Sequence, residues 1–380
     1  MHRDLAHAGD DAVGRRIHSG RIASRVLAAP AFAAAFALVL ALLATVATVR
    51  PVGWNITGLA TVGMDSPLAR DARESDPNFR FVGRPGYDGQ FYWAIAVDPL
   101  ATNRVHRGVD NAPYRYGHPL LGWVGWLLSG GQAGAAAGAL LAVGLISLAA
   151  AAALAAQLAE ALPRARWAPL FVCCNVGLLF SSIHDLVEPL AAALLFGALW
   201  AAARRPRLAV GLCVLLPLAK EQLVLVPIVL AAWEVRRNRG LAAAYLGAIM
   251  PSVAWWAAMR IHLGSWFTSG GAALGAPFSG WRRAILDAGA GAATNDHGDP
   301  KLFILVALGG LLVVATLRAL KFRSRIDGVF LALILVALCL APNATVILRD
   351  ALRNTALLVA LVPFVLVTRR SPSSAEPAAQ

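Results

Sequence analysis

The apolar residues of this chain fall into blocks of roughly 15 to 25 residues, the length that an α-helix needs to cross a hydrocarbon core of about 30 Å. Lipid offers no hydrogen-bonding partners to the backbone, so such blocks are helical where they cross it. The pattern therefore predicts an all-α integral membrane protein. Ten spans are expected, at residues 26–49, 132–159, 167–183, 186–203, 207–220, 221–235, 241–263, 302–319, 327–342 and 352–368.

Composition agrees with this pattern. Hydrophobic residues make up 58% of the 380 residues, charged residues make up 14%, and the mean hydropathy is +0.63. Soluble domains carry about 25% charged residues. The net charge of +13 does not indicate nucleic-acid binding, because arginines cluster at the ends of apolar blocks, where they set membrane topology. The four cysteines lie inside apolar blocks and have no metal-binding spacing.

The segment 113–130 is apolar but short, and the basic clusters decide its placement. If it lies at the membrane interface instead of crossing, all the clusters fall on one side, which the positive-inside rule makes cytoplasmic. These clusters are Arg15/Arg16/Arg21/Arg25, Arg164/Arg166, Arg204/Arg205/Arg207, Arg236/Arg237/Arg239, Arg318/Lys321/Arg323/Arg325 and Arg369/Arg370. Both termini are then cytoplasmic, and the protein is expected to lie in the plasma membrane.

This topology predicts a single membrane domain over residues 26–368. A cytoplasmic tail, 1–25, precedes it, and a disordered cytoplasmic tail, 369–380, follows it. Two long outer loops are expected, at about 50–131 with interfacial helices and at about 264–301. The sequence contains neither a P-loop nor a dinucleotide-binding fingerprint, so ATP-driven chemistry in this chain is not expected.

Ionisable residues near membrane depth are costly, so each one calls for an explanation. In the ten-span topology these residues gather on the outer side. They are Asp88 in the first outer loop, His184, Asp185 and Glu188 between the third and fourth spans, Lys220 and Glu221 between the fifth and sixth, and Arg349, Asp350 and Arg353 before the last. Four separate segments thus bring charge to one face.

Each of these groups has two interpretations. Asp88 precedes glycine and either bonds its own backbone in a turn or acts as a catalytic base. Lys220 and Glu221 either neutralise one another or bind an anionic headgroup, with Glu221 orienting the lysine. Arg349 and Arg353 share one helical face, because they are four residues apart, and either hold a phosphate or reach toward lipid headgroups.

The histidines favour hydrogen bonding over metal binding. His118 precedes a proline and His184 precedes an aspartate, but no spacing to further ligands supports a metal site. No metal is therefore expected. The aromatic residues around His118 suit an interfacial belt.

Four short segments together resemble the GT-C superfamily of membrane glycosyltransferases, particularly bacterial members related to PIG-V-type mannosyltransferases. They are Tyr87-Asp88-Gly89-Gln90-Phe91-Tyr92 after an apolar first helix, His118-Pro119-Leu120-Leu121, and the outer-turn segments 185–189 and 219–221. The resemblance implies that a sugar moves, with inversion, from a polyprenyl-phosphate carrier to a glycan, lipid or protein acceptor at the outer face. The reaction that this resemblance implies needs no further cofactor.

The same resemblance assigns the base to Asp88. Arg349, Arg353 and Lys220 are expected to hold the phosphate, and the remaining candidate binding residues are Tyr87, Gln90, His118, Asp185, Glu188 and Glu221. The chain departs from many relatives in lacking a paired acidic motif directly after the first helix. The alternatives are a secondary transporter or flippase of lipid-linked sugars, and a non-catalytic assembly protein for envelope polymers.

Overall fold

The computed structural model describes residues 29–83, 85–160, 162, 165–268, 274–294, 300–322 and 324–367. Within these ranges every regular element is a helix, and strand-like pairing is limited to isolated bridges such as that between Val62 and Gly86. The all-α prediction is therefore confirmed. The two predicted cytoplasmic tails, 1–25 and 369–380, lie outside the described residues.

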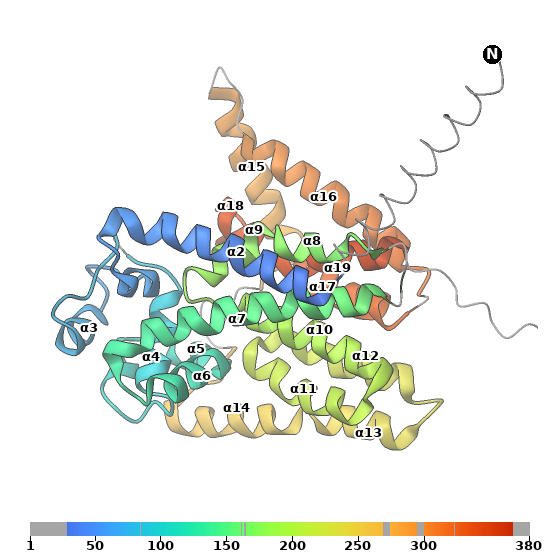
Figure 1. Ribbon diagram of the computed structural model, residues 1–380, viewed down its shortest axis with the longest axis horizontal. Coiled ribbons are helices and arrows are strands. Elements are labelled where there is room, and N and C mark those ends of the chain that lie inside the picture. Colours follow the sequence, from blue (N-terminus) through green and yellow to red (C-terminus); the bar gives the residue numbers. More distant parts are fainter. Residues whose placement is uncertain are drawn as a thin grey trace, which may run out of the picture.

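Helices α2 (Pro30–Val49), α7 (Ala133–Glu160) and α10 (Glu188–Arg204) form the centre of the bundle, with α7 packed against both of the others. Figure 1 shows α2 and α7 running side by side across the molecule. The buried residues of α2 include alanines spaced four apart, Ala33, Ala37 and Ala41. Such small side chains let two helix backbones approach closely, as is common between membrane helices.

In the part of the chain that the structure describes, four helical segments are long and apolar enough to cross a membrane: 30–52, 133–160, 239–263 and 300–319. A fifth is the bent pair α18 (Leu348–Asn354) and α19 (Ala356–Val367), whose axes meet at 51°. The chain is thus a helical protein with several candidate membrane helices. Two of these segments contain more than one element: 239–263 comprises α13 (Arg239–Gly247) and α14 (Met250–Leu263), and 30–52 ends in η1 (Arg50–Val52).

The other predicted spans correspond to shorter helices. Residues 167–183 form α8 (Ala168–Cys173) and α9 (Val176–Ser182), which are separated by a break at Cys174 and Asn175. The predicted spans 207–220, 221–235 and 327–342 correspond to α11 (Pro206–Ala219), to η5 (Glu221–Val224) with α12 (Leu225–Glu234), and to α17 (Arg325–Leu338), whereas the candidate membrane segment 300–319 is α16 (Pro300–Ala319). Each predicted block is therefore helical, whichever of them cross the membrane.

The first predicted outer loop is a layer of short helices at one end of the bundle (Figure 1). It holds η2 (Ile56–Ala60), α3 (Ala69–Ser75), α4 (Gly89–Val97), η3 (Val105–Gly108), α5 (Ala112–Arg115) and α6 (Leu120–Ser129). Helix α6 has ten residues, so it is about 15 Å long and cannot cross a 30 Å core alone. The second predicted outer loop contains a helix that hydropathy did not reveal, α15 (Ser279–Thr294).

Candidate functional site

The Tyr87-Asp88-Gly89 turn packs closely against the loop between α9 and α10. A Cβ atom at Gly89 would lie 2.4 Å from the carbonyl oxygen of His184, so only glycine permits this approach. The Tyr87 amide donates to the carbonyl oxygen of Thr61 at 3.0 Å and fixes the turn from its other side. Asp88 then stands at the start of α4, where its side chain does not cap the helix. The turn interpretation of Asp88 accounts for its backbone but not for its carboxylate.

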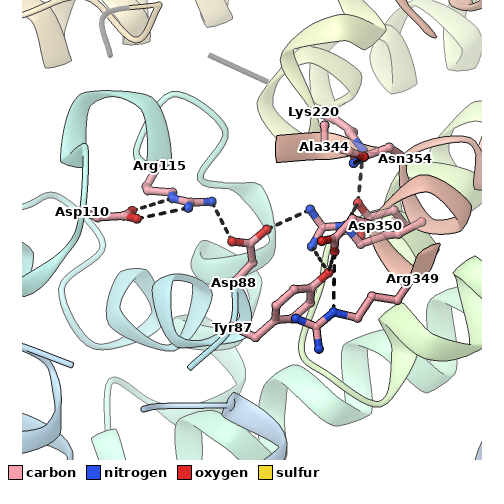
Figure 2. Close-up of polar contacts among 11 residues, drawn as sticks. Tyr87, Asp88, Asp110, Arg115, Lys220, Ala344, Arg349, Asp350 and Asn354 are labelled. Atoms are coloured by element: carbon pink, nitrogen blue, oxygen red, sulfur yellow. Dashed lines mark hydrogen bonds and ion pairs between the residues drawn. The ribbon is translucent and has the colours of Figure 1, made fainter. Parts of the chain in front are cut away.

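The Asp88 carboxylate lies between two arginines (Figure 2). One oxygen is 3.2 Å from Arg115 Nη1, and the other is 2.8 Å from Arg353 Nη2. Burial alone would raise the pKa of Asp88, but the charges of Arg353 and Arg115 outweigh it and lower that pKa to about 2. Asp88 is therefore ionised at neutral pH and, in this arrangement, only weakly basic.

Glu188 joins Arg353 to Lys220. Its Oε1 atom is 3.1 Å from Lys220 Nζ and 3.5 Å from Arg353 Nε, and its side chain is almost wholly buried. Glu188 is the first residue of α10, and Lys220 follows α11 in an extended conformation. The lysine thus pairs with Glu188, across helices, and the expectation that Glu221 orients it is wrong in this structure.

Tyr87 connects the two ends of the network. Its hydroxyl donates to Asp350 and accepts a hydrogen bond from Arg353 Nη1 at 3.1 Å. The guanidinium of Arg349 lies over the Tyr87 ring, 4.3 Å from the centroid, as Figure 2 shows. Arg349 is also 3.9 Å from Asp350 and about half exposed. It therefore stands beside the network, with its charge directed to the ring and to Asp350.

His118 forms the opposite wall with Glu221. Its Nδ1 atom is 3.4 Å from the Glu221 carboxylate without hydrogen-bond geometry, and its ring packs edge-on against Tyr114. Burial lowers the pKa of His118, and the opposing charge of Glu221 does not reverse that shift, so the ring is neutral at pH 7. Among the described residues no group of three metal-ligating side chains occurs.

These side chains surround a cavity of about 180 Å³, called here the central cavity. Its charged lining comprises three basic residues, Arg115, Lys220 and Arg353, and four acidic residues, Asp88, Glu188, Glu221 and Asp350. Several polar atoms at this cavity make no hydrogen bond within the described part of the chain, namely Glu188 Oε2, Arg353 Nε and His118 Nδ1. Buried polar atoms are usually paired, so partners for these atoms are expected from a ligand or water.

An apolar crevice continues from the central cavity. Lys220, Gln222 and Asn354 line both spaces, and beyond them the crevice is walled by apolar side chains of η5, α17, the segment after α17, and α19. Those side chains are Leu223, Leu333, Val336, Ala337, Leu340, Leu357 and Leu358. The crevice is small, about 20 Å³, so in this structure it gives the central cavity an apolar flank but has no room for a lipid tail.

Most of the residues predicted from sequence meet here. Tyr87, Asp88, His118, Glu188, Lys220, Glu221 and Arg353 all line the central cavity. Gln90 lines a neighbouring cavity, and Arg349 lies outside the central one. Asp185 is buried and lines neither, and its two carboxylate oxygens make no hydrogen bond among the described residues.

Sequence reasoning missed Arg115. It contacts Asp88, pairs with Asp110 at 2.9 Å and stacks over Phe91, 4.0 Å from the ring centroid. The available signal was an arginine between two tyrosines at the start of an apolar segment on the predicted outer side, where the positive-inside rule does not call for one.

The chain was compared with protein-family models, with curated proteins and with solved structures, and none of them matches it.

Proposed function

We propose that this chain is a polyprenyl-phosphate-dependent glycosyltransferase with the general plan of the GT-C superfamily. In this proposal it crosses the plasma membrane ten times, has both termini in the cytoplasm and works at the outer face. The donor supplies its sugar already activated by a lipid phosphate, so no further cofactor is required. The acceptor is an envelope glycan, lipid or protein.

One observation carries the proposal: Asp88, Arg353 and Lys220 line a chamber that continues into an apolar crevice. The donor phosphate would bind between Lys220 and Arg353. Its isoprenoid tail would require the helices around the crevice to move apart, because the crevice holds only about 20 Å³. A phosphate is well matched to this pair, because the arginine offers a planar fork and the lysine a compact charge.

The acidic lining adds a requirement to this mechanism. The central cavity is lined by more acidic than basic residues. The phosphate must therefore replace Glu188 as the ion-pair partner of Lys220 and Asp88 as the ion-pair partner of Arg353. Once the phosphate draws Arg353 away, Asp88 loses the positive charge that lowers its pKa most. Donor binding would thereby raise the basicity of Asp88 at the moment when a base is needed.

The reaction is a single displacement. Asp88 accepts the proton of an acceptor hydroxyl, the hydroxyl oxygen forms a bond to the anomeric carbon, and the bond from that carbon to the phosphate oxygen breaks. Polyprenyl phosphate leaves with the electron pair, and Arg353 and Lys220 stabilise its developing charge. Help from a general base is typically worth about 10²- to 10⁴-fold in rate.

The test is reconstitution of the purified chain in lipid nanodiscs with a panel of radiolabelled polyprenyl-phosphate sugars. A glycosyltransferase releases polyprenyl phosphate and labels an acceptor, and Asp88→Asn slows both about 10²- to 10⁴-fold. Mass spectrometry of envelope glycans with and without the gene identifies the sugar. If vesicles instead move intact lipid-linked sugar across the bilayer without cleaving it, the flippase alternative replaces this proposal.

A further inference from the structure

A second cavity, of about 560 Å³, adjoins the central cavity and is called here the loop cavity. Tyr87, Asp88 and Arg115 line both spaces. The Asp88 carboxylate therefore stands in the wall between them, with Arg353 on the central side. A base in this position is reached from two directions.

The loop cavity has a different lining from the crevice. Every residue that lines it lies between Asp65 and Arg115, in the layer of short helices and loops at one end of the bundle. Its rim includes the exposed charged residues Asp65, Arg107 and Asp110. A ligand in the loop cavity meets polar groups, whereas the small crevice on the other side of the central cavity is bordered mainly by leucine side chains.

Gln90 gives this cavity a specific polar group. The side chain is 6% exposed, lines the loop cavity and follows Asp88 by two residues. Its Oε1 atom is buried and makes no hydrogen bond within the described ranges. A buried amide oxygen without a donor is costly, so its position beside a cavity points to a ligand that supplies an O–H or N–H group.

We infer that the loop cavity binds the acceptor as a water-soluble saccharide, with one hydroxyl directed to Asp88 and a second donating to Gln90 Oε1. This inference rests on the proposed function for the role of Asp88. Two neighbouring acceptor groups, a carboxylate and an amide oxygen, call for a molecule with two hydroxyls close together. A serine or threonine side chain has only one, and a lipid acceptor would need an apolar route. The volume lies within the usual range of small-molecule sites, about 300 to 1,000 Å³.

Cysteine protection tests binding without any donor. Ser66 lines the loop cavity, so Ser66→Cys, made together with Cys174→Ala to remove the exposed native thiol, is labelled with a charged maleimide in phosphatidylethanolamine–phosphatidylglycerol nanodiscs. Millimolar methyl glycosides of common hexoses and pentoses serve as probes. At least one of them is expected to slow labelling severalfold.

Gln90→Ala is expected to remove that protection, and Gln132→Ala, an exposed amide outside both cavities, is expected to keep it. The inference is overturned if no methyl glycoside protects, if only a lipid-linked glycoside protects, or if Gln90→Ala retains full protection.

A transfer assay separates this inference from the proposed function. With donor present, Gln90→Ala is expected to raise the KM for the saccharide about tenfold, the effect of one lost hydrogen bond, and Gln132→Ala is expected to leave that KM unchanged. Saccharide protection with no donor cleavage would overturn the proposed function and leave a saccharide site. Donor cleavage with transfer only to lipid or protein acceptors would overturn the inference and leave the function.

Discussion

Two buried arginine–carboxylate networks occupy opposite ends of α10 and differ in what they leave unpaired. Arg353 meets Glu188 at the first residue of the helix. Arg325 donates to the carbonyl oxygen of Ala202, fourteen residues further on and thus about 21 Å along the axis. Arg325 also pairs with Glu234 and thereby ties α17 to both α10 and α12.

The Arg325 network lies between helices and lines neither the central cavity nor the loop cavity, whereas the Arg353 network faces a cavity and keeps unpaired atoms. Both bury charge at a cost that only good pairing offsets. The first arrangement is what helix packing needs. The Arg353 network leaves polar atoms available to form hydrogen bonds with a ligand that enters the central cavity. Substitutions at the two ends should therefore act on different quantities: on stability at Arg325, and on transfer at Arg353 and Asp88.

The largest effect is expected from Asp88→Asn. The amide keeps the shape of the side chain but does not accept a proton, so transfer per folded molecule should fall about 10²- to 10⁴-fold. Asp287→Asn is the matched control, because Asp287 is also ion-paired, at 3.0 Å to Arg283, and is similarly exposed. Radiolabelled sugar transfer in nanodiscs measures both variants. Equal activity in the two variants would remove Asp88 from the mechanism.

Lysine in place of each arginine sharpens the comparison between the two networks. Arg353→Lys keeps the charge but loses the planar fork, so transfer should fall about tenfold to a hundredfold. Arg325→Lys loses the hydrogen bond to the Ala202 carbonyl oxygen and should lower the free energy of unfolding by about 1 to 3 kcal/mol. Thermal unfolding and transfer per folded molecule are measured for both variants. If Arg325→Lys reduced transfer as strongly as Arg353→Lys, the two networks would not be functionally distinct.

The sequence predicted the helical class and much of the site, because hydropathy and the position of charge along the chain carry that information. Asp88, Lys220 and Arg353 were expected on one face and do line one cavity. The partner of Lys220 was not predictable in this way. Lys220 lies in an extended conformation between α11 and η5, so the choice of Glu188 over Glu221 depends on how α10 and α11 pack.

Arg115 and α15 show two further limits. Arg115 reaches Asp88 because the short helix α5 folds back toward α4, a tertiary contact that no local pattern reveals. Helix α15 is too polar for a hydropathy search to find. It docks where Trp281 Nε1 donates to the carbonyl oxygen of Ala337, at 2.6 Å.

Acid should weaken the Asp88 network in a defined window. The folded-state pKa of Asp88, about 2, lies below its ordinary value of 3.8, so its ion pairs contribute stability above about pH 4 and lose it as the pH falls toward 2. The difference in unfolding midpoint between the wild type and Asp88→Asn should therefore be constant above pH 4 and shrink below it. The measurement is thermal unfolding in nanodiscs across that range, with Asp287→Asn as control. A difference in unfolding midpoint that persists unchanged at pH 2 would contradict the lowered pKa of Asp88.

The smallest effect is expected from Asp185→Asn. Asp185 is fully buried, lines neither cavity, and has a positive φ of 53°, a conformation that asparagine also tolerates. Burial raises the pKa of its carboxyl well above the ordinary value, which favours the neutral acid, and an amide has nearly the same shape and polarity. Transfer and the unfolding midpoint should both stay within experimental error of the wild type. A loss of transfer at unchanged stability would instead place Asp185 in the mechanism, as the sequence alone suggested. It would also mean that the Arg353 network at the first residue of α10 does not contain all the acidic residues on which transfer depends.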